Sequence, residues 1–189
     1  MTSTLFWIII GAGAVVLLWA VATYNRFITL RNRADEAWSD VEVQMQRRYN
    51  LIPNLMEAVK GYVKHEATTM ERVTAARNAA MHAGTLAEHA QAETMLTGAL
   101  KTLFAVSEAY PDLKANQNFL ELQHELRDAE DKIMAAWRFS NANVRDLNTK
   151  LEHFPANIIG ALFRFAKKEF FDIDDAIEAR VKEVPKVRF

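Results

Sequence analysis

The sequence has no cysteine and only six glycines and four prolines among 189 residues. The absence of cysteine excludes disulfides, thiolate nucleophiles and zinc sites with cysteine ligands. Glycine and proline supply most tight turns, so their scarcity argues against a β-rich fold with many turns. No segment of useful length shows the alternation of a strand, and the sequence therefore predicts an all-α protein.

Charge is missing from one end of the chain. The first 24 residues contain no Lys, Arg, Asp, Glu or His, so all 23 basic and 24 acidic side chains lie in the remainder. The two signs are interspersed there and sum to a net charge of −1. Because no basic surface is indicated, we expect no nucleic acid partner.

The uncharged stretch from Leu5 to Tyr24 is 20 residues long. As an α-helix it would span about 30 Å, the thickness of the hydrocarbon core of a bilayer. We therefore expect a membrane-spanning helix that contacts lipid. Its apolar and interfacial residues include Leu5, Phe6, Trp7, Ile8, Trp19 and Tyr24.

A cleaved signal peptide is the alternative for this stretch, since Ala20-Val21-Ala22 resembles a cleavage site. However, no Lys or Arg precedes the apolar run, and the run is long for a signal peptide. We favour a retained single-pass anchor. Arg26, Arg31 and Arg33 follow the span directly, and basic residues stay on the cytoplasmic side, so we expect a cytoplasmic body.

The body shows apolar residues at three- and four-residue spacing, which is typical of helices packed in a bundle. The first apolar face runs from Phe27 to Val73. We expect it to belong to one long helical arm that continues the membrane helix, kinks without breaking at Pro53, and ends at Gly84.

Two further long helices are predicted. Thr85 and Glu88 have the spacing of a capping box, which begins a helix that runs to about Ala109. After a turn at Tyr110-Pro111-Asp112, the most regular period extends from Phe119 to Leu151, and Pro155 ends it. We therefore predict an antiparallel bundle of long helices with an N-terminal single-pass transmembrane helix.

The predicted organisation has three parts. Residues 1–24 form an N-terminal segment with the transmembrane helix at about 5–24. Residues 25–155 form the long-helix bundle. Residues 156–189 form a short amphipathic helix and a charged tail.

No enzyme motif is complete in this sequence. His65-Glu66 and His124-Glu125 each open a helical zinc motif, but Thr69 and Asp128 stand where the second histidine is needed. The chain also has no phosphate-binding loop and no nucleophile elbow. We predict no catalytic residues, no metal site and no cofactor.

Glu121 and His124 support an alternative function. Glu-x-x-His is the helical spacing that di-iron carboxylate bundles use twice, together with a glutamate from each of two other helices. Here it occurs once, so we favour a solvated face of the helix for Glu121, His124, Glu125 and Asp128. The alternative is a metal-binding carboxylate-bundle enzyme that uses Glu121 and His124.

Two sets of polar residues interrupt the helical pattern. Arg47, Arg48, Asn50 and Asn54 flank Pro53. We favour the interpretation that these residues satisfy backbone groups freed by the proline or simply face water. The alternative is that they form an interaction surface at the kink. Arg138, Asn141 and Asn148 lie in the most regular helix, either as register-setting contacts between helices or at its solvent edge.

The segment 154–171 contains five of the eleven phenylalanines beside Arg164, Lys167 and Lys168. A basic, aromatic amphipathic helix is typical of an anionic membrane surface. Alternatively, the segment folds back and covers the bundle core. We favour the core, because the phenylalanines point to more than one side.

Several short motifs together resemble the LemA family of bacterial membrane proteins over nearly the whole chain. The motifs are Arg47-Arg48-Tyr49-Asn50-Leu51-Ile52-Pro53-Asn54-Leu55, Lys60-Gly61-Tyr62 with His65-Glu66, Arg77, Tyr110-Pro111-Asp112-Leu113-Lys114-Ala115-Asn116 with Phe119 and Leu122, Glu130-Asp131-Lys132-Ile133, Arg138, Asn141, Asn148 and Phe154-Pro155. Ser140 departs from the pattern, since the family often has tyrosine there.

The resemblance implies a single-pass anchor in the bacterial inner membrane, a bundle of long antiparallel helices and no established catalytic activity. Family members resemble proteins that organise the envelope or membranes. Some are associated with magnetosomes, and others are encoded beside a membrane metalloprotease. We therefore expect a non-catalytic scaffold or adaptor that self-associates and binds a membrane metalloprotease or another envelope protein.

Overall fold

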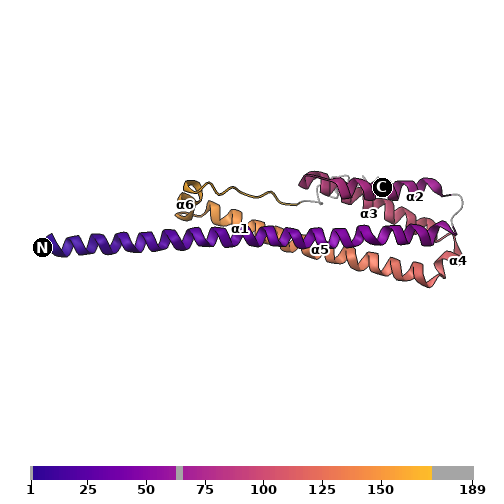
Figure 1. Ribbon diagram of the computed structural model, residues 1–189, viewed down its shortest axis with the longest axis horizontal. Coiled ribbons are helices and arrows are strands. Elements are labelled where there is room, and N and C mark those ends of the chain that lie inside the picture. Colours follow the sequence, from indigo (N-terminus) through magenta and orange to yellow (C-terminus); the bar gives the residue numbers. More distant parts are fainter. Residues whose placement is uncertain (1, 63–65, 172–189) are drawn as a thin grey trace, which may run out of the picture. The chain divides into compact units, whose positions relative to one another are not determined.

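The computed structural model describes residues 2–62 and 66–171 of the chain. The helices are α1 (Thr2–Lys60), α2 (Ala67–His82), α3 (Leu86–Ser107), α4 (Pro111–Lys114), α5 (Gln117–Glu152) and α6 (Ala156–Leu162) (Figure 1). The described residues form no strand. The predicted all-α fold of long helices is confirmed.

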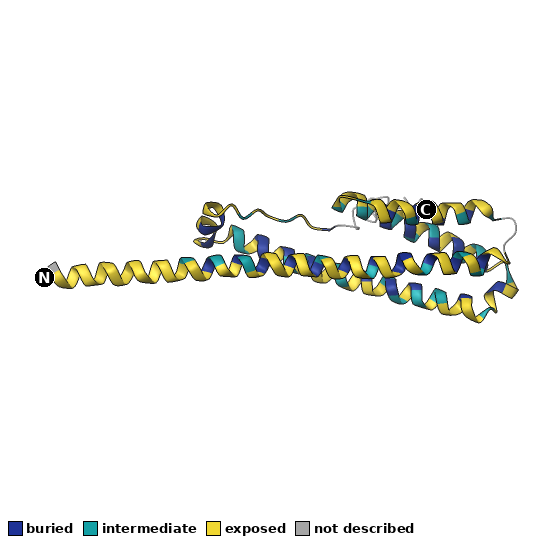
Figure 2. Cartoon of the chain, viewed as in Figure 1, coloured by how far each residue is buried: buried dark blue, intermediate teal, exposed yellow. Residues whose placement is uncertain are grey.

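α1 is a single helix of 59 residues that includes Pro53. No glycine or proline lies between Gly13 and Pro53, so no residue favours a break over that length. The prediction of a continuous helix through Pro53 is confirmed, while the kink there stays a prediction. The N-terminal stretch of α1 is exposed around its circumference, whereas its later part buries one face (Figure 2).

The prediction of one helical arm that extends to Gly84 was wrong. α1 ends at Lys60, a turn follows at Gly61 and Tyr62, and α2 begins at Ala67. Glycine lowers helix stability by about 1 kcal/mol relative to alanine, which favours an end at this point. The Tyr62 hydroxyl also accepts a hydrogen bond of 2.9 Å from Asn116 Nδ2, so the turn is tied to the start of α5.

Contacts divide the chain into two units. In the first unit, residues up to Asp40 pack with Ala136–Phe170. The second unit comprises Val41–Ala135 together with Phe171. α1 and α5 contribute residues to both units, and each unit has its own apolar core.

The second unit contains the end of α1, all of α2, α3 and α4, and the first half of α5. α1 and α5 are antiparallel here, because Arg47 of α1 pairs with Asp128 of α5, whereas Tyr62, just after α1, contacts Asn116, just before α5. The core residues, at helical spacing, are Val41, Met45, Ile52, Leu55, Val59, Val73, Ala76, Ala80, Leu96, Leu100, Leu103, Phe119, Leu126, Ala129 and Ile133.

The capping box predicted at Thr85 is confirmed. Thr85 Oγ1 accepts a hydrogen bond of 3.2 Å from the Glu88 backbone, and Glu88 Oε2 accepts one of 3.0 Å from the Thr85 backbone. These bonds satisfy donors that would otherwise be unpaired at the start of α3. The turn predicted at Tyr110-Pro111-Asp112 contains the short helix α4, which has Pro111 as its first residue and buries Leu113.

Candidate functional site

The predicted membrane-spanning residues lie on the outside of α1. Leu5, Phe6, Trp7 and Ile8 are more than half exposed, and Trp19 is 38% exposed. Within the described residues, α1 is the one helix that is long and apolar enough to cross a membrane. Apolar side chains exposed around a whole helix need a non-aqueous surrounding, which indicates that α1 anchors the chain in a membrane.

The last residue of the apolar run and the arginines after it mark its boundary. Tyr24 is half-buried, and the three arginines used to predict orientation, Arg26, Arg31 and Arg33, are all exposed. Exposed guanidinium groups beside the span fit the interface between lipid and water.

Arg48 is the largest fully buried side chain among the described residues, with 1% of its surface exposed. Its guanidinium forms ion pairs with Glu93 of α3 and Glu130 of α5, and Nη1 donates a hydrogen bond of 3.2 Å to Thr97 Oγ1. For Arg48, the interpretation as a residue that faces water and the interpretation as part of an exposed interaction surface were wrong, since the side chain is buried. Its charge is satisfied by carboxylates from two other helices.

Tyr49 extends this buried network. Its hydroxyl donates a hydrogen bond to Glu93, and its backbone carbonyl accepts one of 2.8 Å from Arg77 Nε on α2. Burial raises the pKa of the Tyr49 hydroxyl above its ordinary value, and the positive charge of Arg48 partly opposes that rise. The network joins α1, α2, α3 and α5, and its buried charges give it a structural role in the unit.

The other polar residues around Pro53 are exposed. Arg47 pairs with Asp128 at 3.3 Å, and the Asn50 side chain accepts a hydrogen bond of 3.0 Å from Gln46. Pro53 and Asn54 are also exposed. For these residues, both the solvent-facing interpretation and an interaction surface remain consistent with the structure.

Asn54 and Glu121, which are far apart in the sequence, line the same groove. The groove has a volume of about 470 Å³ and lies between α1 and α5. Its lining residues are Leu51, Asn54, Glu57, Ala58, Asn118, Glu121, Leu122 and Glu125. Sequence periodicity did not pair these two helix segments, so the groove was not predicted.

A second groove, with a volume of about 780 Å³, lies between the end of α1 and α2. Its lining residues are Met56, Glu57, Lys60, Ala67, Met70, Glu71, Thr74, Ala75 and Asn78. Methionine side chains are flexible and adapt to different partner surfaces. The two grooves give the second unit two candidate surfaces for binding a protein partner.

Glu121 and His124 are both exposed on α5, where we expected a solvated face. Asp128 on the same face forms ion pairs with Arg47 and with Lys132, and the hydrogen bond from Lys132 is the main cause that lowers its pKa. In the described part of the chain, no group of three or more His, Asp or Glu side chains is arranged to hold a metal ion.

Five motif residues later in the chain have different surroundings. Tyr110 is half-buried and Pro111 exposed at the start of α4, while Arg138 is exposed and Asn141 half-buried on α5. Asn148 is buried, and its side-chain amide forms hydrogen bonds with both backbone groups of Lys168. Nδ2 donates to the Lys168 carbonyl at 2.8 Å, and Oδ1 accepts from the Lys168 N–H at 2.9 Å. Asn148 therefore holds the segment after α6 against α5.

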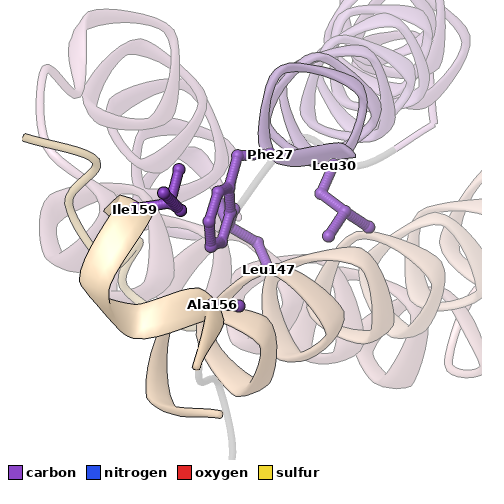
Figure 3. Packing of buried hydrophobic residues seen from close by; sticks show 5 residues of the cluster. All are labelled: Phe27, Leu30, Leu147, Ala156 and Ile159. Carbon is purple, nitrogen blue, oxygen red and sulfur yellow. The ribbon is translucent and has the colours of Figure 1, made fainter. Parts of the chain in front are cut away.

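The first unit has a compact apolar cluster beside the end of the membrane span. Phe27 and Leu30 of α1 pack against Leu147 of α5 and against Ala156 and Ile159 of α6 (Figure 3). Ala20, Tyr24, Leu151 and Phe165 surround these five residues. The alternatives for segment 154–171 are thus partly decided, since α6 and Phe165 pack on the core while Phe154, Phe163 and Phe170 remain exposed.

Glu93 is the main site residue that sequence analysis missed. It is 1% exposed and neutralises Arg48. A signal was present: Glu93 precedes Leu96 by three residues and Leu100 by seven, so it lies on the apolar face of α3. A charged residue on an apolar face indicates a buried ion pair.

Comparison with known proteins finds chains of similar sequence. Protein LemA from Metamycoplasma hominis is 26% identical over 166 residues, which cover 82% of this chain and 74% of that protein. Magnetosome protein MamQ from Magnetospirillum gryphiswaldense is 23% identical over 174 residues, or 78% of this chain and 64% of that protein. Magnetosome protein MamQ 2 from Paramagnetospirillum magneticum matches to the same extent. The match thus spans less than two thirds of the MamQ proteins.

A model of the LemA family matches residues 37–189, which include the buried Arg48 network, both grooves and α6. The matched region begins within α1, after the apolar run. Because this match covers most of the sequence, the chain belongs to the LemA family.

Proposed function

We propose that this chain is a non-catalytic, membrane-anchored scaffold or adaptor of the bacterial inner membrane, with its body in the cytoplasm. It acts by self-association and by binding another envelope protein, for which a membrane metalloprotease is one candidate class. The observation that carries the proposal is the continuity of α1, because the exposed apolar stretch and the buried face of the bundle belong to one unbroken helix.

The continuity of α1 supports a role in which the membrane anchor presents the bundle to binding partners. A helix without a break anchors the bundle directly, with no flexible linker between the span and the folded body. Membrane confinement also orients all copies alike and raises their effective concentration, so weak lateral contacts become sufficient for assembly. Copies in one orientation would meet by cyclic symmetry about an axis normal to the membrane.

The two grooves of the second unit supply surfaces for such contacts. The groove between α1 and α2 combines Met56 and Met70 with small residues, and the groove between α1 and α5 carries Asn54 among carboxylates. A helix with an apolar side fits the first type of surface. We propose that the sides of the bundle, more than the apolar run, make the contacts between copies, because the run has no Gly-x-x-x-Gly spacing.

The proposal is tested by measuring the mass of the full-length protein in nanodiscs and mild detergent with mass photometry over a range of concentrations. We expect a homo-oligomer. Met56→Glu together with Met70→Glu should shift it toward monomer, while Asp112→Lys with Gln123→Glu, a control at two sites outside both grooves, should not. Deletion of residues 1–24 should weaken assembly and leave the helical content of the body unchanged.

A full-length protein that stays monomeric at every concentration would contradict self-association. In that case, chemical crosslinking in native membranes followed by mass spectrometry should identify a single partner, as expected for a one-to-one adaptor.

A further inference from the structure

α6 is packed closely on α1 by one of its sides. Ala156 and Ile159 are buried there against Phe27 and neighbouring residues (Figure 3). Gly160 is buried too, and Phe27 lies nearby. A Cβ atom on Gly160 would lie 2.9 Å from Leu151 Cδ2 and 3.6 Å from the Phe27 ring. The absence of a side chain at Gly160 therefore permits this close approach.

The part of α1 that receives α6 includes the end of the apolar run. Ala20 and Tyr24, both within Leu5–Tyr24, contribute to the cluster around α6. The Tyr24 ring lies 4.7 Å from the Phe163 ring and 5.7 Å from the Phe165 ring, measured between centroids. If the bilayer surrounds the apolar run, α6 lies at the surface of that bilayer.

The opposite side of α6 is apolar and uncovered. Ile158 is 55% exposed and Leu162 is 70% exposed, and on a helical period both point away from the side that contains Ala156 and Gly160. Phe154 before the helix and Phe163 after it are 80% and 53% exposed. Such a patch is unfavourable in water, whereas the boundary between headgroups and acyl chains accommodates it.

A pocket with a cationic lining lies next to this patch. It has a volume of about 410 Å³, and its lining includes Arg31, Arg164, Lys167 and Lys168 but no carboxylate. Lys167 pairs with Glu152, and Lys168 pairs with Asp35. Among the described residues, Arg31 and Arg164 have no carboxylate partner, and the Arg31 guanidinium lies over the Phe165 ring at 5.8 Å.

From this arrangement we infer that α6 and the segment after it form a lipid-binding element at the membrane interface. Ile158 and Leu162 insert at the boundary of the acyl chains, and Arg31 and Arg164 bind the phosphates of anionic lipids. The occupant is the bilayer because the patch joins the apolar run where the exposed Phe163 ring contacts the Tyr24 ring. The inference rests on the proposed membrane anchoring and adds a second point of contact with lipid.

The absence of cysteine allows a direct test, since each introduced cysteine is the sole attachment site for a spin label. The variants Ile158→Cys and Leu162→Cys are placed on the uncovered side of α6. Val16→Cys, 62% exposed within the apolar run, is the reference for lipid. Ser39→Cys is the reference for water, because this exposed residue lies about 22 Å along α1 beyond Tyr24.

The measurement is the collision rate of each label with oxygen, which concentrates in lipid, and with a water-soluble nickel chelate. Full-length protein is reconstituted in vesicles of phosphatidylcholine and phosphatidylglycerol. We expect the labels at residues 158 and 162 to resemble the label at residue 16 more than the label at residue 39. If the labels at residues 158 and 162 have the collision rates of the label at residue 39 while the label at residue 16 reports lipid, the inference about α6 is wrong and the membrane anchoring is still supported. If residue 16 also reports water, the anchoring itself is wrong, and the inference fails with it.

The role of the arginines is tested separately by lipid selectivity. Arg31→Gln with Arg164→Gln is compared with Arg127→Gln plus Arg145→Gln, which removes the same charge from exposed positions outside the pocket. The quantity measured is the ratio of phosphatidylglycerol to phosphatidylcholine that the purified protein retains, determined by mass spectrometry.

We expect the first pair to lower the ratio about fivefold for each arginine removed, from roughly 1 kcal/mol for each basic residue near an anionic surface. The control pair should lower it less than about twofold, since its side chains do not line the pocket. Equal effects of the two pairs would overturn the assignment of the pocket to a headgroup.

Discussion

At the scale of single residues, the second unit depends on a charge placed inside its core. Arg48 lies between Met45 and Ile52 on the buried face of α1, at a position where an apolar residue is usual. Removing an ion from water costs several kcal/mol, and that cost is offset only when partners with good geometry are present. Glu93 and Glu130 are those partners, and loss of Arg48 would leave Glu93 buried without a countercharge.

The first prediction compares two neighbouring arginines. Arg48→Ala should lower the free energy of unfolding by about 3–5 kcal/mol, because it breaks a buried pair. Arg47→Ala should change it by about 0.5 kcal/mol or less, because its pair with Asp128 is exposed to water. Urea unfolding of the full-length protein in detergent, followed by circular dichroism, measures both values.

A third variant distinguishes the two possible causes of destabilisation by Arg48→Ala, which are the loss of the ion pair and the loss of side-chain packing. Arg48→Met combined with Glu93→Met should recover most of the stability lost in Arg48→Ala, because an apolar pair of similar volume needs no countercharge. Equal destabilisation by Arg47→Ala and Arg48→Ala would contradict the role assigned to the buried pair.

The second prediction concerns the alternative of a metal enzyme. Glu121→Ala with His124→Ala should change the free energy of unfolding by no more than about 1 kcal/mol, as expected for exposed residues. Elemental analysis of protein purified without added metal accompanies this measurement. Iron, manganese or zinc at one equivalent in the unaltered protein, absent from the double variant, would support the enzyme alternative over the scaffold.

At the scale of helices, local signals placed most boundaries correctly. The capping box at Thr85, the turn at Pro111 and the end of α5 before Pro155 all follow from short motifs with strong conformational preferences. The end of α1 was missed because the apolar period continues in phase past Gly61 to Val73, so periodicity alone predicts one arm. After the turn, α2 lies beside α1, where Arg77 donates a hydrogen bond to the Tyr49 carbonyl, and this contact is not encoded in the periodicity.

The third prediction tests the start of α3 by pH. Hydrogen bonds from the backbone of Gly84, then from that of Thr85, lower the pKa of Glu88 below its ordinary value. The ionised carboxylate therefore stabilises the fold above the pKa of the unfolded state, and this stabilisation is lost as the pH falls through the lowered pKa. Glu88→Ala should thus reduce the melting temperature at neutral pH, with a difference that narrows in acid.

The control for this prediction is Glu88→Gln, whose amide oxygen still accepts from the backbone but does not titrate. Its melting temperature should fall less than that of Glu88→Ala at neutral pH. A difference between Glu88→Ala and the unaltered protein that stays constant down to strongly acidic pH would show that the carboxylate charge does not contribute.

The candidate site illustrates what the sequence could and could not supply. The apolar run and the arginines after it were evident, because composition alone identifies them. The pairing of Arg48 with Glu93, and of Asn148 with the backbone of Lys168, depends on which helix faces cross. Glu93 could have been recognised from its place on an apolar face, whereas the backbone partner of Asn148 left no signal in the pattern.

At the scale of the whole molecule, the fourth prediction concerns orientation. The arginines after the apolar run favour a cytoplasmic body, because basic residues next to a span are retained on that side. A reporter enzyme that is active only in the cytoplasm, fused after Phe189, should therefore be active in cells. A fused reporter that is active only outside the inner membrane should be inactive, and activity of this second fusion would overturn the orientation but not the anchor.

The contact between α6 and the end of the apolar run bears on bilayers of different thickness. A free apolar helix accommodates a mismatch by sliding, tilting or deforming the lipid around it. Here the Tyr24 ring lies against Phe163 and Phe165, so α1 cannot slide along its axis without moving α6 deeper or breaking the cluster. If α6 rests at the interface as inferred, it fixes the depth of α1, and a thinner bilayer is met mainly by tilt. The thickness of the membrane then sets the tilt angle of α1, the helix that also forms part of the bundle.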